Sequence, residues 1–148
     1  MRPFLIKIKK IAHLNGNTFL LLLESFLLLL LAQFCLKSIQ FERLTKCIGK
    51  LNHPHPVPPP PVRPSDFGAI GDAIEIVSRN VGWQVTCYPK ALCAKWMLRL
   101  RGYPSTLYLG VKRDAAGRLA GHAWLGNSAG FIVGGDGSEE YKVIATYT

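Results

Sequence analysis

The chain has 148 residues, of which 49% are hydrophobic, and it carries a formal net charge of +9. This length allows one modest domain with an accessory segment and excludes two full domains. The positive charge indicates an anionic partner, but neither zinc-finger spacing nor an interleaved aromatic pattern accompanies it, so we expect no nucleic-acid binding. Residues 1–50 contribute +6 of the charge and residues 51–148 contribute +3, so the first third differs in character from the rest.

An apolar run covers residues 18–36, interrupted only by Thr18, Glu24, Ser25 and Gln33. Its 19 residues approach the length of a membrane-spanning helix. Glu24 and Gln33 would lie on opposite sides of such a helix, so it has no clean polar face and must be buried in protein or in lipid. The length, Glu24 and the lack of a small-x-small cleavage site disfavour a signal peptide. Membrane association through residues 18–36 and docking of this helix onto protein therefore remain alternatives.

A proline-rich stretch divides the chain. Residues 41–51 are expected to form a short amphipathic helix, and the repeated prolines of residues 52–64 favour an extended, semi-rigid linker. We therefore predict three parts: a hydrophobic and basic N-terminal segment at 1–51, the linker at 52–64 and a folded domain at 65–148.

Two helices are predicted at the start of this domain. Ser65 or Asp66 can cap the first, which runs to about Asn80. The second starts at about Pro89, a residue suited to a first turn, and stops at Gly102. The apolar stripes predicted to be buried are Ile70, Ala73, Ile74, Val77 and Val81 in the first helix, and Leu92, Cys93, Trp96 and Leu100 in the second.

Beyond Pro104 the apolar pattern changes to a period of two, which is typical of strands. We predict a strand around Leu107–Val111, a hairpin turn at 113–118 and a returning strand at 119–125. Further strands are expected at 131–133 and 141–147. Helices followed by an antiparallel β-meander indicate the α+β class.

Cys87 and His122 are the candidate catalytic pair. Cys87 stands just before the second helix, where peptide dipoles and free N–H groups favour a thiolate. His122 lies in a predicted strand, and a nearby imidazole can take the thiol proton and later protonate the leaving group. Cys93 falls on the apolar stripe and is interpreted as a packing thiol.

No metal or other cofactor is expected. His53 and His55 flank Pro54 without a second cluster at ligand spacing, so they are more typical of a loop. The four cysteines form no Cys-x-x-Cys pair, which favours a reduced compartment.

A third residue must hold the imidazole in the right tautomer. If the turn after residue 125 makes a hairpin, His122 lies opposite Gly134, and Asp136 becomes a diagonal neighbour on the same face. The alternative is that residues 134–137 are a loop in which Asp136 only forms a turn. Weaker candidates for the same role are Asn127 and Glu139.

Acyl transfer also needs hydrogen-bond donors for the developing oxyanion. The backbone N–H of Cys87 is one, and the side chain of Gln84 is a second candidate. A surface Gln in a loop is the alternative interpretation of Gln84.

Several motifs together resemble a known family: the stretch around Cys87 from Trp83 to Leu92, the Arg101-Gly102-Tyr103-Pro104 turn, Leu109-Gly110-Val111, and Gly121-His122-Ala123-Trp124-Leu125. They look like the stand-alone peptidase half of the lasso-peptide maturation B proteins, in the transglutaminase-like branch of the papain-like cysteine peptidases. The resemblance covers nearly the whole chain. His122 follows Cys87 by 35 positions, which suits the family interval.

This resemblance implies a bacterial, cytoplasmic enzyme, free or at the inner face of the cell membrane, that removes the leader from a ribosomally made lasso-peptide precursor. It implies three partners: the precursor leader, a separate leader-recognition protein and an ATP-dependent lasso cyclase. Cys87 matches the nucleophile and His122 the base and acid. The family acid falls near Gly134, where Asp136 is the nearest carboxylate, and Tyr88 replaces an expected Leu. The alternatives are a transglutaminase-like acyltransferase with the same dyad and a non-catalytic, membrane-associated adaptor.

Overall fold

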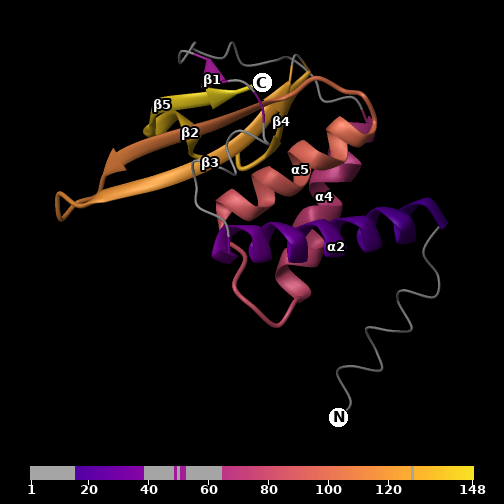
Figure 1. Ribbon diagram of the computed structural model, residues 1–148. Coiled ribbons are helices and arrows are strands. Elements are labelled where there is room, and N and C mark those ends of the chain that lie inside the picture. The colour runs from indigo at the N-terminus through magenta and orange to yellow at the C-terminus, as the bar shows by residue number, and fades with distance from the viewer. Residues whose placement is uncertain (1–15, 39–48, 50, 53–64, 128) are drawn as a thin grey trace.

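The computed structural model describes residues 16–38, 49, 51–52, 65–127 and 129–148. Within these ranges, helices α2 (Gly16–Ser38), α4 (Ser65–Asn80) and α5 (Cys87–Leu100) gather on one side of a twisted sheet (Figure 1). The sheet contains five strands: β1 (Leu51–Asn52), β2 (Thr106–Arg113), β3 (Leu119–Asn127), β4 (Gly130–Val133) and β5 (Lys142–Tyr147). All the strand pairs are antiparallel, which confirms the predicted α+β class.

The hairpin of β2 and β3 forms where the sequence predicts it. Pairing runs from Thr106 opposite Gly126 to Arg113 opposite Leu119. Asp114 closes the turn, because its carboxylate accepts hydrogen bonds from the backbone N–H groups of Ala116 and Arg118, both at 2.9 Å. Local turn chemistry therefore fixes the register of this hairpin.

The sheet is not the simple meander that the sequence pattern predicts. Its strand order is β1-β5-β2-β3-β4, so β5 pairs with β2 instead of with its predecessor β4. A segment from Gly134 through a 3-10 helix, η1 (Ser138–Glu140), carries the chain from β4 to β5. Two glycines with positive φ, Gly134 at 71° and Gly137 at 75°, make this crossover.

The region between α2 and α4 differs from prediction where it can be compared. Leu51 and Asn52 form the edge strand β1 against Tyr147 and Thr146, not the end of a helix or the start of a linker. The predicted helix at 41–51 and linker at 52–64 otherwise lie outside the described residues, apart from Gly49.

The hydrophobic core lies between the sheet and helices α4 and α5. The predicted stripe of α4 is confirmed, with Ile70, Ala73, Ile74 and Val77 buried and Val81 packed against the core. Helix α5 begins at Cys87, two residues before the predicted start at Pro89. The predicted burial of Leu100 is wrong, because this residue is 72% exposed where the helix ends and Gly102 turns the chain with φ at 73°.

Helix α2 packs along α4 and α5 on the side away from the sheet (Figure 1). Ser25, Leu29 and Ala32 are fully buried at this contact. Arg101 also donates hydrogen bonds of 2.7 and 2.6 Å to the two carboxylate oxygens of Glu24. One side of the apolar helix is therefore docked onto protein, although by length and composition alone α2 could also cross a membrane.

Candidate functional site

Cys87 is the first residue of α5, and its thiol is free and half-buried. Thr86 precedes it in an extended conformation (φ −85°, ψ 178°), and the Thr86 side chain makes no capping hydrogen bond. The N–H groups of the first helical turn are therefore not occupied by this side chain. Such a position favours an anionic sulfur or an anionic oxygen bound nearby.

Tyr88, which replaces the Leu expected from the family pattern, is partly buried against the core. Burial raises the pKa of its phenol to about 12, and the nearby Tyr147 contributes to the same shift. Tyr88 therefore stays neutral at physiological pH, and it contributes packing at the start of α5.

His122 is half-buried on β3, opposite Gly110 of β2. Its Nε2 lies 2.8 Å from the carbonyl oxygen of Gly134. A carbonyl oxygen only accepts hydrogen bonds, so Nε2 must carry the proton in this contact. The neutral imidazole then keeps its lone pair on Nδ1, which is the nitrogen that can act as a base.

Two aromatic rings hold the imidazole. The Trp124 ring stacks with it at a centroid distance of 5.6 Å, and the Tyr141 ring lies 4.9 Å away on a tilted plane. Gly110 makes room for both, because a Cβ at this position would lie 2.8 Å from the Trp124 ring and 2.9 Å from Tyr141 Cβ. The sequence pattern did not single out Trp124 or Tyr141 as neighbours of His122.

The structure does not join the two predicted catalytic side chains. Alternation along β3 places Ala123 and Leu125 on the face that packs on the helices, and His122 with Trp124 on the other face. Cys87 packs against the helix-side core. Within the described ranges no hydrogen bond connects Cys87 with His122.

The predicted pairing of β3 with β4 is off by one to two residues. Asn127 pairs with Gly130, the register shifts between Gly126 and Leu125, and the ladder ends with Leu125 opposite Val133. His122 therefore has no ladder partner on β4, yet the carbonyl of Gly134 reaches its ring.

The candidate acid Asp136 and the candidate oxyanion donor Gln84 lie at the surface. Asp136 is exposed in the crossover after β4, and Gln84 is exposed in the loop before α5. Among the described residues, no hydrogen bond links Asp136 to His122 or Gln84 to Cys87. The predicted roles of these two side chains therefore stay predictions.

Cys93 is fully buried, and burial raises the pKa of its thiol to about 12. It lies within 3.7 Å of the Ser25 carbonyl oxygen and 4.0 Å of Met97 Sδ. These surroundings suit the predicted packing role.

Lys95 is a buried cation that the sequence analysis missed. Its side chain donates to the carbonyl oxygens of Ser105 at 2.7 Å and Tyr147 at 3.3 Å. Burial, with a smaller effect of Arg99, lowers the pKa of its ammonium to about 8. Because Lys95 joins α5 to the start of β2 and the end of β5, we interpret it as structural.

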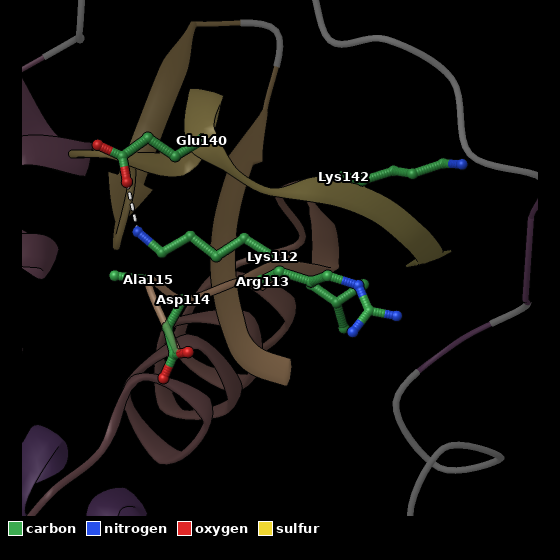
Figure 2. Close-up of a pocket in the computed structure, with 7 residues that line it drawn as sticks. Lys112, Arg113, Asp114, Ala115, Glu140 and Lys142 are labelled. Atoms are coloured by element: carbon green, nitrogen blue, oxygen red, sulfur yellow. Dashed lines mark hydrogen bonds and ion pairs between the residues drawn. The ribbon is translucent and has the colours of Figure 1, made fainter. Parts of the chain in front are cut away.

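A shallow pocket lies beside Tyr141, one of the two aromatic neighbours of His122. Figure 2 shows its charged rim, where Lys112 forms an ion pair with Glu140. The Lys112 ammonium also lies 4.6 Å from the centre of the Tyr141 ring. The pocket is lined by Val111, Lys112, Arg113, Asp114, Ala115, Glu140 and Lys142. Neither Cys87 nor His122 lines it, and within the described ranges no group of three or more His, Cys, Asp or Glu residues could hold a metal ion.

Comparison with known proteins assigns this domain. The family model of the transglutaminase-like superfamily matches residues 28–146. This match includes α5 with Cys87, β3 with His122 and residues 28–38 of α2. No curated protein and no solved structure matches the chain. The chain therefore belongs to the transglutaminase-like superfamily, which contains cysteine peptidases and acyltransferases.

Proposed function

We propose that this protein is a cysteine peptidase that removes the leader from a ribosomally made lasso-peptide precursor. The observation that carries the proposal is the position of Cys87, a free thiol at the first residue of a helix within the matched domain. The residues around Cys87 and His122 that resemble the lasso maturation proteins support the choice of substrate.

The proposed reaction has two steps. His122 takes the proton of the Cys87 thiol, and the thiolate attacks the carbonyl carbon of the scissile peptide bond. The backbone N–H groups at the start of α5 stabilise the oxyanion, with Gln84 as a further donor. The C–N bond breaks as His122 gives a proton to the leaving amine, which is the N-terminus of the core peptide. Water, deprotonated by His122, then hydrolyses the thioester, which releases the leader acid and restores the thiol.

Two groups compete for the role of orienting His122. The family pattern favours Asp136, whereas the Gly134 carbonyl already contacts Nε2 at 2.8 Å. If the carbonyl suffices, Asp136→Asn keeps leader release within about threefold of the parent, because a carbonyl acceptor fixes the same tautomer. A loss on the order of 10⁴, as when the acid of a catalytic triad becomes an amide, would assign the role to Asp136.

The placement of His122 sets a further requirement. His122 lies on the face of β3 opposite to Ala123 and Leu125, whereas Cys87 packs against the helix-side core, so we propose that substrate binding brings the start of α5 and β3 together. A binding partner can stabilise the arrangement with Cys87 beside His122 only if it binds that arrangement more tightly than the one in the structure. The leader-recognition protein, holding the precursor, is the partner we propose for this role, and the ATP-dependent lasso cyclase acts on the product.

The same separation favours a second candidate, a non-catalytic adaptor. The chain also has Gly134 where the family pattern places an acid, and this favours the adaptor as well. Alkylation of Cys87 by iodoacetamide, followed against pH with and without precursor and recognition protein, separates the two candidates. A thiol pKa well below 8.5 in the complex supports the peptidase, whereas an ordinary value in both states supports the adaptor.

Leader release is the direct test of the nucleophile. Precursor and recognition protein are incubated with the parent, with Cys87→Ala, or with the matched control Cys35→Ala, which removes a half-buried free thiol from α2. We expect Cys87→Ala alone to abolish release. In ¹⁸O-labelled water, hydrolysis places the label in the leader carboxyl group, while a transglutaminase-like enzyme yields a cross-linked, unlabelled product.

A further inference from the structure

Over residues 19–34, the second side of helix α2 is apolar and exposed, and Phe26 at its border contacts the ring of Trp83 at a centroid distance of 6.0 Å. Eight large side chains on this side are between 37% and 66% exposed: Phe19, Leu20, Leu23, Phe26, Leu27, Leu30, Leu31 and Phe34. At about 100° per residue they form one stripe roughly 140° wide and about 24 Å long. We name this stripe the outer face of α2. It is turned away from α4 and α5, whose contact buries Ser25, Leu29 and Ala32.

Between residues 19 and 34, polar residues stand only at the borders of the outer face. On the helical repeat, Glu24 falls at one edge and Gln33 at the other, and Glu24 is neutralised by Arg101. Lys37 falls on the stripe itself, at the C-terminal end of the helix, and is exposed. The face is thus a band of Leu and Phe with a cation at one end.

The contacts of the opposite side argue against a helix that crosses a bilayer. Crossing would either break the Glu24–Arg101 pair at 2.6 Å and expose the buried side of α2, or carry α4 and α5 into hydrocarbon. Those helices bear Asp72, Glu75, Arg79 and Lys90, whose charges are costly inside a membrane. A helix held along its length by protein can present its outer face only to the surface of a bilayer.

Charge and composition select lipid over protein as the occupant. Protein interfaces combine apolar area with polar groups and aromatic or Arg anchors, and Leu is under-represented among their hot spots. Residues 1–50, which include α2, carry a net charge of +6, and this opposes pairing with a second copy of the same segment. An apolar stripe between basic flanks suits an anionic bilayer surface.

We propose that the outer face of α2 binds the surface of an anionic lipid bilayer, with the helix axis parallel to the membrane. Its Leu and Phe side chains enter the boundary between headgroups and acyl chains. The sheet then lies on the side of the helices away from the membrane (Figure 1). This inference does not depend on the proposed peptidase activity.

Vesicle sedimentation tests it with the full chain. Vesicles of phosphatidylglycerol and phosphatidylcholine are compared with phosphatidylcholine alone, using the parent, the double variant Leu27→Glu/Leu30→Glu and the double control Leu119→Glu/Ile144→Glu. Leu119 is 70% exposed on β3 and Ile144 is 55% exposed on β5, so the control adds the same charge away from α2. We expect the parent to bind anionic vesicles at least tenfold more tightly than neutral ones, and the double variant, but not the control, to lose at least tenfold.

Several results would overturn the proposal. Equal binding of the double variant and the parent would show that another surface carries attachment, and equal binding to both vesicle types would remove the anionic requirement. If the parent does not bind vesicles but forms a dimer, and the double variant is a monomer, the outer face of α2 would be assigned to a second copy. Carbonate washing should release the vesicle-bound parent, and resistance to it would indicate a spanning helix. Unchanged circular dichroism and urea midpoints of both variants show that the fold is intact.

Discussion

Replacing Leu29 by Ala should destabilise the whole domain, because α2 is part of its core. Leu29 is fully buried where α2 meets α4 and α5. A buried Leu→Ala change costs about 2–5 kcal/mol, from lost transfer free energy and the cavity left behind. We expect about 3 kcal/mol at this site, and a melting temperature lower by about 9 °C in a chain of this length. Urea unfolding followed by tryptophan fluorescence measures the loss.

Leu27→Ala provides the matched control two residues away. Leu27 is 54% exposed on the outer face of α2, so its truncation should change the free energy of unfolding by no more than about 0.5 kcal/mol. The slope of the free energy of unfolding against urea concentration should be the same in both variants, because unfolding exposes the same surface area. If Leu29→Ala costs no more than Leu27→Ala, then α2 is not packed on α4 and α5, and the argument for a helix lying along the membrane surface fails with it.

Two further predictions concern buried contacts of the sheet. Gly110→Ala should cost about 1–3 kcal/mol in urea unfolding, because the new methyl group would overlap the Trp124 ring, and no measurable loss would contradict that packing. The pKa of Lys95 is lowered to about 8 in the folded state from an ordinary 10.5, so the unfolded chain binds more protons between these values and stability should rise with pH across this window. Buried Cys93 has a raised pKa, so its thiol lowers stability as the pH rises above about 9. The measurement is therefore the free energy of unfolding of the parent minus that of Lys95→Met, which should increase between pH 8 and 9. A constant value would contradict the lowered pKa of Lys95.

The sequence predicts the fold best where the signal is local. The α4 helix from Ser65 to Asn80 is predicted by its apolar period, and the β2–β3 hairpin by alternation and by a turn that contains Asp114. The place of β5 beside β2 depends on contacts between distant segments, and no local pattern distinguishes it from a meander. The same limit applies to β1, because the two residues Leu51 and Asn52 become a strand only by pairing with β5.

The candidate site divides in the same way. The preference for negative charge at a helix start made Cys87 a candidate, and the structure places this residue at the start of α5. The hydrogen-bond acceptor of His122 was beyond prediction, since a backbone carbonyl such as that of Gly134 leaves no mark in the residue types. The sequence also does not distinguish the buried side of α2 from the exposed side. Positions 29 and 30 are both Leu, and only packing makes Leu29 buried and Leu30 exposed.

Intact-mass spectrometry of the protein, quenched in acid during turnover with precursor and recognition protein, tests the central claim most directly. A peptidase acting through Cys87 forms a thioester, so a fraction of the chain should gain the mass of the leader fragment less one water. The Cys87→Ala variant should show no adduct and no leader release. Release that continues in Cys87→Ala would contradict the account.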